Sequence, residues 1–174
     1  FTNNPTLAGS LQPVDLTRRK FPSVTDAEKV LASYRAEYER LKTAGAERAK
    51  VRTAEVSVFG AEALLKLARA QQSGKIDRWL DTLRPFEMQA VRIGDACIAV
   101  LPGEFFAEYG LDLKRRAATK SFVVTYANGE LQGYIVTPQA AAAGGYEAAS
   151  SMFEPKAGAL MVETAVKMIN HLVK

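Results

Sequence analysis

The feature that most constrains the fold is a continuously apolar run from Ala96 to Leu101. A run of this kind is expected of a central strand that is buried on both faces. From Pro85 onward, apolar and polar residues alternate, which is typical of a second strand. Gly94-Asp95 separates the two segments, so the sequence predicts a hairpin that ends at Pro102-Gly103-Glu104. The rest of the chain must supply the layers that cover it.

Two long segments with helical periodicity precede this hairpin. The first begins at the candidate helix caps of residues 23–26 (SVTD) and ends at Gly45, and the second covers residues 46–72. The tight turn between them predicts an antiparallel helical hairpin. Because the apolar stripes are short and rich in alanine, packing against the parent domain is favoured over a coiled-coil dimer. Residues 1–22 are punctuated by proline and glycine and are expected to form an irregular, extended arm or linker.

Short helices and strands alternate after the hairpin. This order predicts an α/β (mixed α+β) fold in which a helical hairpin is followed by a few buried strands flanked by helices. Three or four strands are too few for a complete sheet with two covered faces, so we expect an incomplete half of a larger domain. The elements expected are a helix over 104–118, strands over 122–126 and 134–136, an alanine-rich helix from Pro138 to Gly144-Gly145, and a helix over 156–173.

Composition excludes several classes of protein. The 174 residues suffice for about one domain, 48% are apolar and 24% are charged, so a sizeable core and an ordered chain are expected. The net charge of +4 comes from interleaved acidic and basic residues, which does not favour nucleic-acid binding. The single cysteine, Cys97, is expected to be a buried inert thiol. No apolar run approaches the length of a bilayer span. The start at Phe1 suggests a processed product or a fragment.

Three polar residues stand where regular elements start or stop, each close to glycine. Glu104 follows Pro102-Gly103, Tyr134 follows Gly133, and Tyr146 follows Gly144-Gly145. Glu104 could simply be an acid in a first helical turn, where it stabilises the helix dipole, or it could be a metal ligand or general base at a sheet edge. The two tyrosines could be ordinary packing residues, or phenols that face a ligand.

Familiar catalytic constellations are absent from the sequence. The only histidine, His171, lies in the last turn of the last predicted helix, where a cation is favourable, and no Ser-His-Asp arrangement can be built without it. There is no CxxC, HExxH or glycine-rich phosphate loop. A catalytic zinc site usually needs three protein ligands, commonly with histidine, so this chain cannot complete one alone.

Four motifs occur in one order: Ile93-Gly94-Asp95, Leu101-Pro102-Gly103-Glu104-Phe105, 133–138 (GYIVTP) and 145–150 (GYEAAS). Together they resemble the neutral/alkaline, non-lysosomal ceramidase family, in the C-terminal part of its catalytic domain. The resemblance covers about residues 86–172 and is closer to the bacterial ceramidase-like proteins than to the well-studied ceramidases. It implies that residues 23–174 are the C-terminal portion of a ceramidase-like catalytic domain.

That family hydrolyses the amide bond of ceramide with a zinc ion held by two histidines, a glutamate and a tyrosine. The resemblance implies that Glu104 and Tyr134 are the zinc ligands of this chain and that Tyr146 is the catalytic phenol near the scissile carbonyl. The histidines are expected from an upstream portion of the same domain, so the chain alone should be inactive. The resemblance also implies a lipid-like N-acyl substrate and a secreted or periplasmic location.

Two alternatives stay open. A homologue could act on a different amide or an ester, because a groove for a long lipid cannot be recognised in these residues. A non-catalytic structural or interaction module is also compatible with the sequence, in which case Glu104, Tyr134 and Tyr146 would point in different directions.

Overall fold

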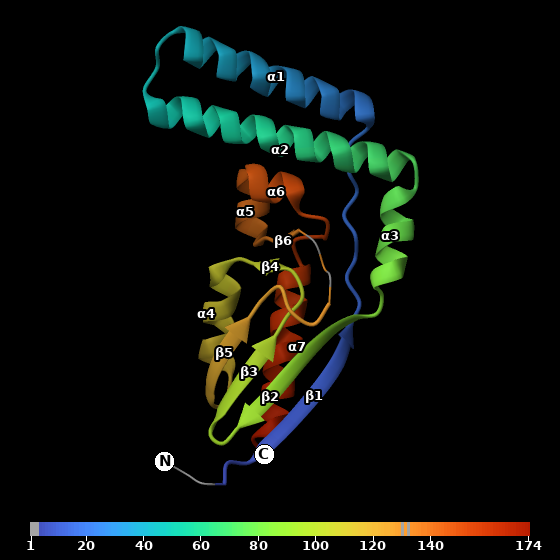
Figure 1. Ribbon diagram of the computed structural model, residues 1–174, viewed down its shortest axis with the longest axis vertical. Coiled ribbons are helices and arrows are strands. Elements are labelled where there is room, and N and C mark those ends of the chain that lie inside the picture. Colours follow the sequence, from blue (N-terminus) through green and yellow to red (C-terminus); the bar gives the residue numbers. More distant parts are fainter. Residues whose placement is uncertain (1–3, 130, 132) are drawn as a thin grey trace. The chain divides into compact units, whose positions relative to one another are not determined.

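The structure is a computed structural model that describes residues 4–129, 131 and 133–174 (Figure 1). The chain divides into two compact units. The first unit comprises residues 1–18, 83–138 and 152–174, and the second comprises residues 19–82 and 139–151. The mixed α and β content confirms the predicted fold class. Each unit is described separately below.

The first unit is built on a four-stranded sheet in the order β1-β2-β3-β5. Strands β1 (Leu7–Val14), β2 (Phe86–Ile93) and β3 (Ala96–Val100) are antiparallel, whereas β5 (Lys120–Val124) runs parallel to β3. The predicted hairpin of β2 and β3 is confirmed, with Ile93 opposite Ala96.

The expectation of an irregular arm over residues 1–22 is wrong for residues 7–14, because they form the edge strand β1. Leu7 pairs with Ile93 and Val14 pairs with Phe86, so β1 receives its hydrogen bonds from a segment far along the chain. Proline is tolerated in an edge strand, because one side of the strand needs no partner. Residues 1–3 of the expected arm lie outside the described residues.

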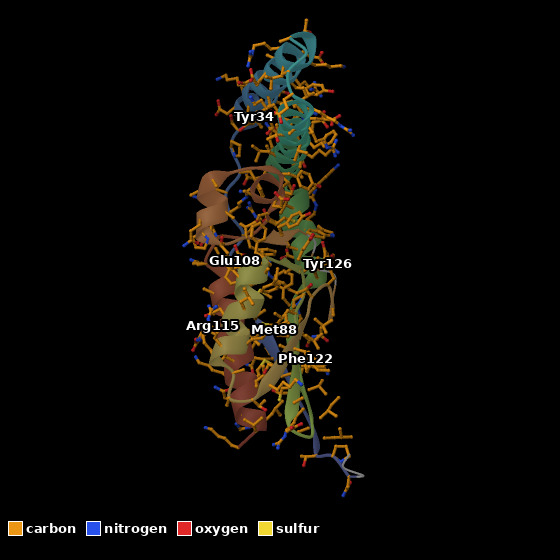
Figure 2. The ribbon with its side chains drawn as sticks, turned by 90° about the vertical axis from the view of Figure 1, so that its left-hand side faces the viewer. Tyr34, Met88, Glu108, Arg115, Phe122 and Tyr126 are labelled. Carbon is orange, nitrogen blue, oxygen red and sulfur yellow. The ribbon has the colours of Figure 1, made fainter. Side chains whose placement is uncertain are left out.

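One face of the sheet is buried beneath two helices, α4 (Ala107–Arg116) and α7 (Ala157–Leu172). Met88, Cys97 and Ala99 point to this face and are fully buried. On the opposite face, Phe122 is 47% exposed, and Figure 2 shows it on the side of the sheet away from α4. The expectation that β3 is buried on both faces is therefore wrong for the described residues, because its buried and partly exposed residues alternate.

The second unit contains the helical hairpin that the sequence predicts. Its helices are α1 (Val24–Thr43) and α2 (Arg48–Gln72), which lie side by side in Figure 1. The Ser23 hydroxyl accepts a hydrogen bond from the backbone N–H of Asp26 at 3.1 Å, which satisfies a donor of the first turn. The unit also contains two short helices, α5 (Pro138–Ala143) and α6 (Tyr146–Ser150), and α6 packs on α2.

Helix α3 (Lys75–Leu83) was not anticipated from the sequence, and it carries Trp79. Its buried residues, Ile76 and Leu80, are spaced as one helical face. The glycine at 74 ends α2 with a φ of 65°, so the chain turns and starts a new helix at once.

Candidate functional site

The candidate site lies where the parallel strands β3 and β5 end, within the first unit. Sites in α/β proteins commonly lie at the carboxyl ends of parallel strands. Here the two following loops are tied together by backbone hydrogen bonds: the Leu101 N–H donates to the carbonyl of Val124 at 2.9 Å, and the Ala127 N–H donates to the carbonyl of Leu101 at 3.2 Å. The loops therefore form one connected edge rather than two independent segments.

Glu104 does not open a helix, contrary to the expectation of a helix over 104–118. It begins the two-residue strand β4 (Glu104–Phe105), and α4 starts only at Ala107. The stabilisation of a helix dipole is therefore not the reason for this carboxylate. Its backbone N–H donates to the carbonyl of Gly133 at 3.2 Å, which joins β4 to the strand that carries Tyr134.

The structure brings Glu104 and Tyr134 together. Strand β4 pairs in parallel with β6 (Tyr134–Ile135), and Glu104 is the direct partner of Tyr134 in this ladder. Directly paired residues project their side chains to the same face of a sheet. A carboxylate and a phenol from distant parts of the sequence therefore stand next to each other, and both side chains are half-buried.

A glycine is required immediately before Glu104. Gly103 has a φ of 88°, and a Cβ there would lie 3.1 Å from Cδ2 of Leu131 and 3.4 Å from Cγ1 of Ile135. The positive φ favours glycine, and the close approach lets the chain run directly beneath the β6 segment. The Pro102-Gly103 pair thus turns the chain out of β3 and into β4.

Tyr126 is a candidate site residue that the sequence did not reveal. Its phenolic O–H donates a hydrogen bond to Oε2 of Glu104, and its φ of 55° is uncommon for a bulky residue. Figure 2 shows its position beyond the end of β5. In the sequence it reads as the last residue of an apolar strand, and only the left-handed backbone turns its side chain toward Glu104.

Tyr109 of α4 fixes the supporting structure. Its hydroxyl lies 3.1 Å from the carbonyl oxygen of Val136 and 3.3 Å from that of Pro155 and donates toward both. Its ring packs edge-on against Phe105, with the ring centroids 6.0 Å apart. Burial raises the pKa of Tyr109, so the phenol stays protonated and keeps donating. This one side chain therefore contacts both Phe105 of β4 and Val136, the residue that follows β6.

Tyr146 belongs to the second unit, so its convergence with Glu104 and Tyr134 stays a prediction. It is the first residue of α6 and is half-buried. Gly144 and Gly145 precede it with φ values of 79° and 95°, so two left-handed residues set the direction in which α6 starts. The Tyr146 carbonyl accepts a hydrogen bond from the Ser150 hydroxyl at 2.8 Å.

The donor atoms present fit part of a zinc site. Carboxylate oxygen is a normal zinc ligand, and Glu104 lies beside a phenol that a cation would help to deprotonate. Within residues 4–129, 131 and 133–174, no group of three or more His, Cys, Asp or Glu side chains could hold a metal ion. Cys97 is fully buried, as expected, and burial raises the pKa of its thiol. His171 is exposed in the last turn of α7.

No protein-family model matches this chain, and no curated protein matches it. Solved structures that are similar to this chain include two ceramidases. One is described as ceramidase complexed with C2, with 27% identity, a TM-score of 0.44 and coverage of 50% of this chain and 15% of that chain. The other is the neutral ceramidase from Pseudomonas aeruginosa, with 27% identity, a TM-score of 0.43 and coverage of 49% and 15%. The matched region is thus about half of this chain and about one seventh of those proteins.

No helix among the described residues is both long enough and apolar enough to cross a membrane.

Proposed function

We propose that this chain is part of a zinc-dependent amidohydrolase that cleaves the N-acyl amide bond of ceramide or a ceramide-like lipid. In this proposal Glu104 and Tyr134 ligate the zinc ion and Tyr146 is the catalytic phenol. Two histidine ligands come from a polypeptide segment outside this sequence. A secreted or periplasmic location belongs to the same proposal.

The observation that carries the proposal is the direct pairing of Glu104 with Tyr134 in the β4–β6 ladder. The resemblance in the sequence names these two residues as ligands of one ion, which requires them to be neighbours in space. The location at the carboxyl ends of β3 and β5 supports a site there as well.

The chemistry follows from the donors. A bound zinc ion supplies an activated water and polarises a carbonyl. Glu104 contributes a negative charge that holds the cation, and Tyr134 contributes a phenol oxygen on the same face. Tyr146 would donate a hydrogen bond to the oxyanion that forms as water adds to the amide carbonyl. Because α6 starts after two glycines, little side-chain bulk next to Tyr146 opposes the approach of a substrate.

Metal binding and hydrolysis in the full-length polypeptide test the assignment of roles. Glu104→Gln and Tyr134→Phe are expected to lower the zinc content after dialysis. Tyr146→Phe should keep its zinc and lose about 10²–10³ in kcat, as expected for one oxyanion donor. Tyr34→Phe is the matched control, because Tyr34 is an exposed tyrosine of α1. Wild-type zinc content in Glu104→Gln would refute the metal assignment.

Substrate class is tested separately, by fatty-acid release from ceramide and from short N-acyl amides and esters. Preferential cleavage of ceramide supports the lipid assignment. Cleavage of only the short substrates would instead support a homologue with another substrate. A full-length protein that binds no zinc and cleaves none of them would support the non-catalytic module.

A further inference from the structure

We propose that Tyr126 is a positioning residue for Glu104: it holds one carboxylate oxygen and thereby leaves the other to bind the metal. The inference rests on the proposed function and deepens it. It assigns a role to a residue that the sequence motifs leave out. The argument comes from the hydrogen bond, the backbone conformation and the loop connections of this one residue.

The hydrogen bond occupies a defined oxygen. The Tyr126 hydroxyl donates to Oε2 of Glu104, so Oε1 is the oxygen left for a cation. Carboxylates that ligate metals are themselves commonly hydrogen-bonded, because the outer partner fixes the orientation of the ligand. The geometry therefore favours monodentate ligation by Glu104. A carboxylate without this partner could rotate and chelate with both oxygens.

The backbone of Tyr126 is in a strained, left-handed conformation, and this conformation directs its side chain toward Glu104. A φ of 55° at a tyrosine is unfavourable, and strained residues of this kind cluster at functional sites. Two backbone hydrogen bonds maintain the conformation: the Tyr126 N–H donates to the carbonyl of Gly103 at 3.0 Å, and the next N–H, of Ala127, donates to Leu101 at 3.2 Å. The same connection thus fixes Tyr126 and the residue that precedes Glu104.

The alternative is an exposed tyrosine with no role. Tyr126 is 63% exposed, so burial of its ring contributes little to stability. Asparagine or glycine would adopt the left-handed backbone at lower cost than tyrosine. The hydrogen bond from the phenolic hydroxyl to Glu104 is a side-chain contact that sets tyrosine apart from glycine at this position.

The test measures zinc affinity of the full-length polypeptide by competition with a chromogenic chelator, and the melting temperature of its metal-free form. Tyr126→Phe removes only the hydroxyl and should lower zinc affinity about 10- to 100-fold while the metal-free melting temperature stays unchanged. Tyr126→Asn should lower the affinity similarly and raise the metal-free melting temperature, because asparagine tolerates the left-handed conformation. X-ray absorption of the bound zinc should show a higher coordination number in Tyr126→Phe.

Two results would overturn the inference. Wild-type affinity in Tyr126→Phe would show that the hydroxyl does not act on the ligand, and a fall in affinity fully matched by a fall in metal-free stability would show a merely structural role. Glu104→Gln separates this failure from that of the proposed function. If Glu104→Gln loses zinc and Tyr126→Phe does not, the role of Tyr126 alone is refuted. If Glu104→Gln binds zinc normally, the metal site itself is refuted.

Discussion

Replacing Gly158 with alanine should destabilise the first unit, although the same change usually stabilises a helix. Gly158 is buried at the start of α7, directly against the ring of Tyr109. A Cβ there would overlap the ring carbons and would lie 2.5 Å from the hydroxyl oxygen. The ring cannot move without losing its hydrogen bonds to Val136 and Pro155.

Whether Gly158→Ala raises or lowers the free energy of unfolding depends on the balance of the steric and hydrogen-bond costs against the helix propensity of alanine. Overpacking costs about 1–3 kcal/mol, and disturbing the two hydrogen bonds adds about 1–2 kcal/mol. Alanine instead of glycine in a helix contributes at most about 1 kcal/mol of stability. Gly158→Ala is therefore expected to lower the free energy of unfolding by about 1–4 kcal/mol. Urea unfolding followed by far-ultraviolet circular dichroism measures this change.

Two further variants isolate the collision as the cause. Gly110→Ala in α4 is the matched control, because a Cβ there meets no atom within 4 Å, and it should stabilise by about 0.5–1 kcal/mol. In a Tyr109→Ala background the ring is absent, so Gly158→Ala should become stabilising as well. An equal loss of stability in the wild-type and Tyr109→Ala backgrounds would refute the reasoning.

Three other stability changes follow from the first unit, each measurable by urea unfolding. Arg92→Met should cost about 2 kcal/mol at low and high salt alike, because the guanidinium donates to uncharged carbonyls, one of them in the last turn of α7 at 2.7 Å; a strong salt dependence would contradict this. Hydrogen bonding to Arg116 lowers the pKa of Asp112, so its contribution is present at neutral pH and is lost as pH falls through the folded-state pKa. Arg116→Gln should therefore be less stable than wild type at neutral pH, with the difference closing below about pH 4; a constant difference would exclude this linkage. Phe122→Ser should lower the free energy of unfolding by less than about 1 kcal/mol, whereas Met88→Ala on the buried face should lower it by about 2–5 kcal/mol. Equal losses of stability would show that both faces of the sheet are covered.

The sequence predicted the elements whose hydrogen bonds are local. The β2–β3 hairpin follows from two apolar segments and the turn at Gly94, which has a φ of 62°. The helical hairpin follows from periodicity and from the candidate caps of residues 23–26, among which the structure has Ser23 as the N-cap. In both cases the partners that satisfy the backbone lie within a few residues or across one turn, so the local pattern contains the information.

Remote pairing decided what local patterns missed. Residues 7–14 form strand β1 because they pair with β2 along their whole length, although the glycine and the proline within them, Gly9 and Pro13, favour a loop. Glu104 is in a strand rather than a helix because Gly133, far along the chain, supplies the carbonyl that its N–H needs. Propensity within a window cannot anticipate a partner outside that window.

The candidate site shows the same division. The sequence by itself indicated Glu104 and Tyr134 as candidate site residues. Both lie beside glycines at the boundaries of predicted elements, and the ordered motifs that contain them resemble a known family. Only the tertiary structure placed the two in one register and turned Tyr126 toward Glu104 through a left-handed backbone. The physical reason is that residue types record which chemistry is available, whereas a register and a positive φ arise from hydrogen bonds between segments that the sequence keeps apart.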